Sequence, residues 1–223
     1  MHIGIIGGIG PGATEFYYRH LVKQASHAGG ARLELTIVHA QMSELVENLK
    51  ADSAESQAQI YLELANRLKA AGAEMVALAS VAGHFCEQDF SEVSPLPLVS
   101  LIGEMDRYLA KQGFEKVGIL GNKFTMESRL FGGVSAAELV VPQGDDLELV
   151  NELYMNMATR GEATKAESEA LVKIGSGLCS EQGAQAVLLA GTDLFLAFGN
   201  GDCGYRVIDS ALVHIDALMQ QIR

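Results

Sequence analysis

Residues 70–80, "AAGAEMVALAS", decide the fold of this chain, because the pattern returns 111 residues later as "EQGAQAVLLAG" at 181–191. Each segment is a short apolar run that follows a Gly-Ala pair and stops at a small residue, which is typical of a buried parallel strand. A second pair, "MHIGIIGG" at 1–8 and "EKVGILGN" at 115–122, has a similar separation, with 114 residues between Gly4 and Gly118. Two matching pairs in the same order predict a duplicated α/β lobe.

The segments around these runs have the patterns of further strands and covering helices. In the first half, a helix is expected from about Ala13, a strand in "RLELTIVHA" at 32–40, and a long amphipathic helix at 53–73. That helix would place Ile60, Leu64 and Leu68 on one face. This βαβαβ order predicts a mainly parallel sheet covered by helices on both faces.

The repeat also predicts two domains. Residues 1–96 plus 205–223 should form the first lobe, closed by a C-terminal helix, and residues 97–204 the second. The Pro-containing stretch 91–102 is the expected crossing. Duplicated lobes of this kind are pseudo-symmetric and turn their strand ends toward an interlobe cleft, where open α/β sheets bind ligands.

Composition narrows the class of partner. The formal net charge of -12 disfavours nucleic acid and anionic membranes, which both need a basic surface. No apolar run approaches the roughly 20 residues that span a bilayer, and the first residues lack the pattern of a signal peptide, so we expect a cytoplasmic protein. Cys86, Cys179 and Cys203 are widely spaced, which favours reduced thiols over disulfides or a metal site.

The glycine-rich segment "GGIGPGAT" at 7–14 follows the first strand and precedes a helix. It contains the G-x-G-x-x-A spacing of a dinucleotide loop, but a nicotinamide site needs an acidic residue at the end of the second strand, which here ends in His39. A turn whose amides and helix N-terminus receive a small anion needs no such partner. We therefore assign Gly8, Gly10 and Thr14 to substrate binding.

Several motifs, taken together and in order, resemble the aspartate/glutamate racemase superfamily. They are "IGIIGGIGPGATEFYYRHL", "AAGAEMVALAS", "KVGILGNKFTMES", "ELVVPQGDD", "GAQAVLLAGTDL" and "VIDSALVHIDAL". The resemblance implies cofactor-independent chemistry, a small amino acid or carboxylate as substrate, a dimer, and one cysteine from each lobe on opposite sides of the substrate α-carbon. One thiolate then removes the α-proton while the other thiol delivers a proton.

Both expected cysteines are replaced in this chain. The family turn "C-N-T-x-H" reads Ser80, Val81, Ala82, Gly83 and His84 here, and the "G-C-T-E" turn reads Ala190, Gly191, Thr192 and Asp193. A serine hydroxyl is too weak an acid to exist as a free base near neutral pH. Gly191 has no side chain at all.

Other side chains must then supply the chemistry. His84 is the candidate to take the proton of Ser80, because imidazole titrates near neutral pH. Asp193 matches the family glutamate, and we assign Ser80, His84 and Asp193 to catalysis.

The remaining candidates are assigned to substrate binding: His39, Thr125, Gly191 and Thr192. Thr125 has a structural alternative, as the N-cap of a helix at 126–131. His39, His84 and Asp193 are suitable ligand types for a metal, but no tight spacing supports a metal site, and we expect none. The "P-x-R" segment of aspartate-specific members is missing from residues 39–53, so neither aspartate nor glutamate is favoured as substrate.

These residues predict an isomerase-type enzyme that acts at the α-carbon of a small amino or carboxylic acid with non-thiol acid/base groups. The alternative is a catalytically silent homologue that binds a small carboxylate. Loss of both thiols favours the alternative or a different reaction. The retained glycine turn, Thr125, Thr192 and Asp193 favour a site that still binds an anion.

Overall fold

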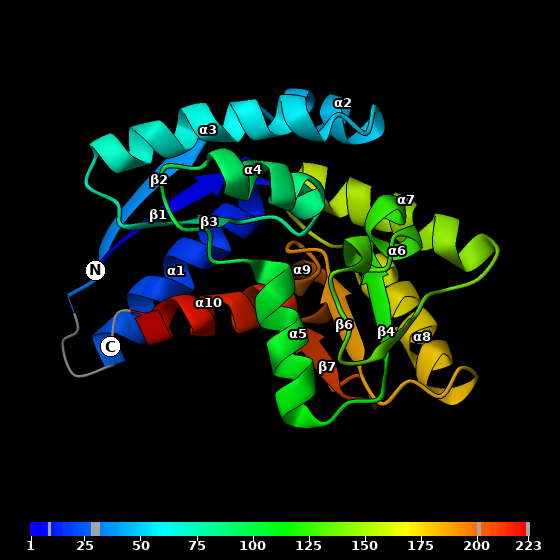
Figure 1. The fold of residues 1–223 in the computed structure, drawn as a ribbon. Coiled ribbons are helices and arrows are strands. Elements are labelled where there is room, and N and C mark those ends of the chain that lie inside the picture. The colour runs from blue at the N-terminus through cyan, green and yellow to red at the C-terminus, as the bar shows by residue number, and fades with distance from the viewer. Residues whose placement is uncertain (9, 28–31, 200–201, 222–223) are drawn as a thin grey trace. The chain divides into compact units, whose positions relative to one another are not determined.

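The computed structural model describes residues 1–8, 10–27, 32–199 and 202–221. The chain divides into two compact units. Unit 1 comprises Met1–Leu101 and His214–Arg223, and unit 2 comprises Ile102–Val213. Each unit has its own sheet, and every strand pair in both sheets is parallel (Figure 1). The predicted fold of two α/β lobes with parallel sheets is confirmed.

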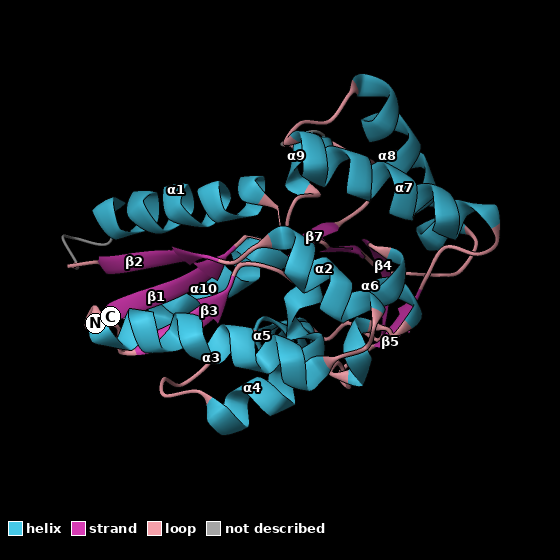
Figure 2. Ribbon diagram, turned by 90° about the horizontal axis from the view of Figure 1, so that it is seen from above, coloured by secondary structure: helices cyan, strands magenta, loops and turns pink. Residues whose placement is uncertain are grey.

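Unit 1 is built on three strands in the order β2-β1-β3. The strands are β1 (His2–Gly7), β2 (Glu34–His39) and β3 (Met75–Leu78). The helices are α1 (Pro11–His27), α2 (Met42–Lys50), α3 (Ala54–Ala70), the 3-10 helix η1 (Ala82–Cys86) and α4 (Glu87–Val93). Helix α3 covers one face of the sheet and α1 the other (Figure 2). Strands β1 and β3 are therefore almost wholly buried, which explains their continuous apolar sequences.

Unit 2 is built on four strands in the order β5-β4-β6-β7. The strands are β4 (Lys116–Gly121), β5 (Glu138–Val140), β6 (Val187–Ala190) and β7 (Val207–Asp209). Its helices are α5 (Leu101–Gln112), α6 (Lys123–Glu127), the 3-10 helix η2 (Leu130–Gly132), α7 (Asp145–Arg160), α8 (Lys165–Ser180) and α9 (Phe195–Phe198), and α10 (Ser210–Gln221) begins in this unit. The order β5-β4-β6 repeats β2-β1-β3, as expected for a duplicated lobe.

Gly4 and Gly118, the first glycines of the two repeats, are needed for the same structural reason. A Cβ on Gly4 would lie 2.9 Å from Cδ1 of Leu68, and a Cβ on Gly118 would lie 2.9 Å from Cβ of Leu178. In both units, the helix before the last matched strand therefore packs directly against the backbone of the central strand. Glycine is required for this close approach.

The segment after β3 also matches the segment after β6. Val76 forms a parallel bridge with Leu98, and Val187 pairs with Val207 in β7. The same hydrogen bond closes both pairs, from Val76 N–H to the Pro97 carbonyl at 3.0 Å and from Val187 N–H to the Arg206 carbonyl at 2.8 Å.

These pairings explain where the unit limits fall. Residues 97–101 were expected in the second lobe, but they belong to unit 1 because Leu98 pairs with β3. Residues 205–213 were expected in the first lobe, but they belong to unit 2 because β7 pairs with β6. Helix α10 begins in unit 2, and from His214 onward it belongs to unit 1.

Within the described part of the chain, no helix has both the length and the apolar character needed to cross a membrane.

Candidate functional site at the strand ends

In unit 1, the carboxyl ends of the strands bring three predicted segments together. Gly7 lies opposite His39, and Ile6 lies opposite Leu78. The N–H of Ala79 donates to the Ile6 carbonyl at 3.0 Å, so the turn that contains Ser80 begins beside the glycine-rich turn. Parallel pairing therefore places these segments at one edge of the sheet.

The glycine-rich turn uses backbone angles that favour glycine. Gly8 and Gly10 have φ values of 128° and 82°, and a Cβ on Gly8 would lie 2.9 Å from the carbonyl carbon of Ala40. Helix α1 begins at Pro11, two residues before the expected start, because proline is favoured in the first turn. Thr14 lies in that turn with its side chain against Gly7. Ile9 lies outside the described residues.

His39 is exposed at the end of β2. In the parts of the chain that the structure describes, no group of three or more His, Cys, Asp or Glu side chains is arranged to hold a metal ion. His39 and His84 belong to unit 1, and Asp193 belongs to unit 2.

The turn after β3 is closed by its own hydrogen bonds. Ser80 is 7% exposed, and its Oγ accepts the N–H of Gly83 at 3.2 Å. His84 contacts the carbonyl of Ser80, with Nδ1 at 2.7 Å, and its Nε2 accepts the N–H of Leu101 at 3.2 Å. Since Nε2 accepts, Nδ1 carries the proton of a neutral imidazole. His84 therefore meets Ser80 through the backbone carbonyl, and both of its nitrogens are bonded to backbone groups.

A second histidine lies beside His84 in unit 1. His214 on α10 has its ring centroid 6.3 Å from that of His84. Its Nε2 is 2.8 Å from the Val99 carbonyl, and its Nδ1 is 2.8 Å from the Tyr17 hydroxyl. Because a carbonyl only accepts, Nε2 carries the proton and Tyr17 donates to Nδ1.

Burial keeps both histidines neutral. It lowers the pKa of His84 below its ordinary value, and it lowers the pKa of His214 to about 3, since a proton on both neighbouring rings would also bring repulsion between them. We therefore describe His84, His214 and Tyr17 as the buried histidine network of unit 1.

The turn after β6 in unit 2 is organised differently. Thr192 and Asp193 are each 1% exposed, and the N–H of Leu194 donates to the Gly191 carbonyl at 3.0 Å. A Cβ on Gly191 would lie 2.8 Å from Cζ of Tyr154, with Cε2 nearer still. The ring of Tyr154, on α7, fills the space into which a side chain at position 191 would project.

Sequence reasoning missed Tyr154. It precedes Gly191 by 37 residues, in the segment "NELYMNM" of a helix whose pattern reads only as a buried apolar face. Burial raises the pKa of Tyr154 well above its ordinary value, and the nearby charge of Asp193 raises it further. Tyr154 is therefore a neutral phenol at physiological pH.

Thr125 lies in α6, the short helix that follows β4. Gly121 pairs with Ala190, so the residues that follow these two strands are neighbours at the sheet edge. Thr125 is not the N-cap that the sequence suggested, because the helix begins at Lys123. Asn122 caps α6, and its Oδ1 accepts the Thr125 N–H at 2.9 Å. Thr125 is fully buried, and its Oγ1 has no hydrogen-bond partner.

Burial makes the three cysteines poor candidates for a thiolate base. Cys86 ends η1, and its Sγ lies 3.6 Å from the Gly83 carbonyl. Burial raises its pKa to about 12, and burial also raises the pKa values of Cys179 and Cys203. A thiol with a raised pKa is protonated near neutral pH and is a poor base.

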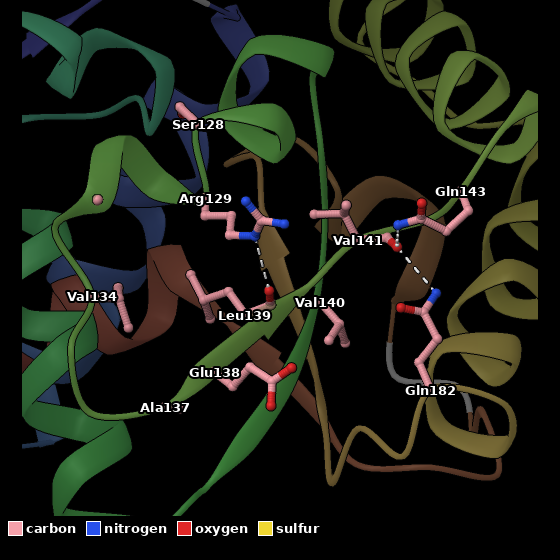
Figure 3. A pocket seen from close by; sticks show the side chains of 11 residues that line it. Ser128, Arg129, Val134, Ala137, Glu138, Leu139, Val140, Val141, Gln143 and Gln182 are labelled. Carbon is pink, nitrogen blue, oxygen red and sulfur yellow. Dashed lines mark hydrogen bonds between the residues drawn. The ribbon is translucent and has the colours of Figure 1, made fainter.

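A hollow of about 720 Å³ lies beside the edge strand β5 of unit 2 (Figure 3). Its polar side chains bond to the backbone near that edge: Arg129 Nε donates to the Leu139 carbonyl at 3.3 Å, and Gln143 and Gln182 each donate to the Val141 carbonyl at 3.1 Å. None of the residues that we assign to catalysis or substrate binding from the sequence lines this hollow. The strand ends remain the candidate site.

Comparison with known proteins identifies the family and the fold of this chain. A family model for Asp/Glu/Hydantoin racemase matches residues 6–218. The structure of an aspartate racemase homologue from Pyrococcus horikoshii is 28% identical, covers 99% of this chain and 98% of its own, and superimposes with a TM-score of 0.82. A putative Asp/Glu racemase from Yersinia pestis is 25% identical, with coverages of 100% and 99% and a TM-score of 0.84.

A third structure, the aspartate racemase of Picrophilus torridus, is 21% identical and shares the fold, with coverages of 100% and 94% and a TM-score of 0.83. Since the family model spans nearly the whole sequence, this chain belongs to the Asp/Glu/Hydantoin racemase family.

Proposed function

We propose that this protein is an isomerase-type enzyme that moves a proton at the α-carbon of a small amino or carboxylic acid without a thiol as base. Membership of the racemase family supports the reaction class. Ser80 and Gly191 stand at matching places, just after β3 and β6, where the family resemblance expects cysteines. The acid/base step then falls to the side chains beside these two positions.

The observation that carries the proposal is the place of Asp193. It is a carboxylate, 1% exposed, two residues beyond Gly191 in the turn after β6. A carboxylate in a dry site is a competent general base, as a neutral serine hydroxyl is not. We assign proton transfer to Asp193, which takes the α-proton and leaves the electron pair on the substrate as a carbanion stabilised by its carboxyl group.

In unit 1, we propose that the turn after β3 binds the substrate and does not transfer the proton. Because both nitrogens of His84 bond to the backbone, His84 acts as a positioning residue that holds the Ser80 turn. The Ser80 hydroxyl then meets the substrate as a hydrogen-bonding group. An acid/base role for His84 would require it to release the Leu101 N–H.

The substrate-binding assignments are part of the proposal. Gly8, Gly10 and Thr14 at the start of α1 offer amides and a hydroxyl to a carboxylate, and His39 ends the adjacent strand. In unit 2, the buried and unpaired Oγ1 of Thr125 is a polar atom that a ligand would satisfy. Thr192 and the backbone of Gly191 are the other binding groups that we assign in unit 2.

The test is α-proton exchange in deuterated water, followed by loss of the Hα signal in proton NMR. The panel contains D- and L-amino acids and small dicarboxylic acids. We expect exchange by the wild-type protein, loss of exchange in Asp193→Asn, and no change in Glu181→Gln, which removes an exposed carboxylate of the same unit. If the folded protein shows ligand-induced shifts but no exchange on any member of the panel, it is a carboxylate-binding protein and the enzymatic proposal is wrong.

A further inference from the structure

We propose that Tyr154 is a ligand-contacting residue of unit 2, with its ring in the space beside Gly191 and its hydroxyl as a hydrogen-bond donor to the bound acid. The identity of the ligand in this inference rests on the proposed function. The position of the Tyr154 ring beside Gly191 is independent of that function. A side chain at position 191 would project onto the Tyr154 ring, so the ring occupies the place that such a side chain would have.

The placement follows from the elements that carry the two residues. Tyr154 lies on the buried face of α7, together with Val150, Met157 and Ala158, and α7 packs on β4. Strand β4 pairs with β6, which ends at Ala190. The phenol ring is thus brought over the end of β6 by the packing of a regular helix, which gives it a fixed position.

The charge around Tyr154 determines what its hydroxyl is able to do. Asp193 is close enough for its charge to oppose ionisation of the phenol, and burial acts in the same direction. The hydroxyl therefore keeps its proton and acts as a neutral donor. A buried neutral donor stabilises a bound carboxylate without the repulsion that a second anion beside Asp193 would cause.

A second tyrosine in unit 2 shows what a purely structural version of this contact looks like. A Cβ on Gly175 would lie 2.8 Å from Cζ of Tyr205, so Tyr205 also packs on a glycine. Its hydroxyl, however, bonds to the Val172 carbonyl at 3.0 Å within the unit. Tyr205 thus provides the matched control for Tyr154.

The first experiment measures affinity in the full-length protein by calorimetric titration with D-aspartate, L-aspartate and succinate. Tyr154→Phe keeps the ring and removes the donor, so we expect at least about tenfold weaker binding, the loss typical of a hydrogen bond to a charged group. We expect Tyr205→Phe to lower the melting temperature and to leave affinity unchanged. Unchanged affinity in a folded Tyr154→Phe protein, or no binding of these probes by the wild-type protein, would overturn the ligand contact.

The second experiment tests the geometry without any ligand. Gly191→Ala should lower the melting temperature by several degrees in the wild-type background and by a much smaller amount in a Tyr154→Leu background, because the smaller side chain vacates the space. An equal loss in both backgrounds would show that the ring does not occupy the space beside Gly191. Absence of α-proton exchange together with Tyr154-dependent binding would overturn the proposed enzyme and leave this contact intact.

Discussion

The turn after β3 in unit 1 and the turn after β6 in unit 2 follow equivalent strands of two similar sheets. The two turns are held by different kinds of contact. In unit 1 the turn after β3 is closed by hydrogen bonds among Ser80, Gly83, His84 and Leu101. In unit 2 the turn after β6 is closed by an aromatic ring from another helix, packed against Gly191. Equivalent positions of a duplicated fold are therefore filled by different physical means, a hydrogen-bonded network around Ser80 and an aromatic ring beside Gly191.

The histidines sharpen this contrast. All six lie within residues 1–101 and 214–223, so unit 2 contains none. The two buried histidines, His84 and His214, join α10, the Ser80 turn and the segment that crosses from β3 to α5. We therefore expect removal of a polar group to lower the free energy of unfolding most in unit 1. We expect an added side chain to lower it most beside Gly191 in unit 2.

The largest expected effect is that of His84→Ala. The substitution leaves the Ser80 carbonyl and the Leu101 N–H without their partner and opens a cavity, which together should cost about 3–5 kcal/mol of the free energy of unfolding. Urea denaturation measures this loss. As a control, His27→Ala removes an exposed histidine of α1 and should change stability by less than about 0.5 kcal/mol. Similar losses for the two variants would contradict the hydrogen-bonded role of His84.

Introduction of a thiol at each of the two positions directly compares the units. Gly191→Cys forces a side chain against the Tyr154 ring and should cost about 1–3 kcal/mol. Ser80→Cys keeps a side chain of similar size and should cost less than about 1.5 kcal/mol. Thermal and urea unfolding of the two variants gives the difference. The ordering of the units would be wrong if Ser80→Cys were the more destabilising of the two.

Acid should lower the free energy of unfolding through the two buried histidines of unit 1. The pKa of His214 is lowered to about 3 in the folded protein, and that of His84 is also lowered, whereas an unfolded histidine titrates near 6.5. Below pH 6.5 the unfolded chain then binds protons that the folded protein does not bind. The free energy of unfolding should fall as the pH decreases from about 6.5 toward 3, by up to about 1.4 kcal/mol per pH unit for each histidine.

The decisive comparison is the slope of stability against pH between 6.5 and 5. It should be shallower in His214→Gln than in the wild-type protein. A His214→Gln slope equal to that of the wild type would show that His214 is not held neutral by burial.

The smallest expected effect is that of Tyr17→Phe. It removes the hydroxyl that donates to Nδ1 of His214 and leaves a buried acceptor unpaired, at a cost of about 1 kcal/mol. Tyr18→Phe, at the exposed neighbouring position, is the matched control and should be neutral. Equal stability of the two variants would remove Tyr17 from the buried histidine network.

Local sequence patterns predict most of the fold and only part of the site. The apolar runs at 1–8 and 115–122 predict buried strands, and Gly4 and Gly118 within them admit a leucine from the covering helix, a constraint that is visible as a repeat. Tyr154 was not predictable, because its contact with Gly191 depends on the angle at which α7 packs on the sheet.

Two details of the site were not predictable from residue type. The cap of α6 depends on the residue at which the helix begins, and the partner of His84 depends on the direction of its ring. Thr125 has the chemistry of a cap, but α6 begins earlier and Asn122 takes that role. His84 is close to Ser80 in sequence, yet η1 directs its ring to the Ser80 carbonyl and away from a role as partner of the hydroxyl. Residue type predicts the kind of group in a site, whereas its partner depends on helix limits and turn geometry.

The position of His214 in the chain has a consequence for biosynthesis. Tyr17 and Val99 belong to the first half of the sequence, but their shared partner is translated only after all of unit 2. Unit 2 is one continuous segment and is able to fold as it leaves the ribosome, since domains generally fold as units during synthesis. The hydrogen bonds of Tyr17 and Val99 to His214 in the interior of unit 1 are therefore able to form only after the whole of unit 2 has been translated.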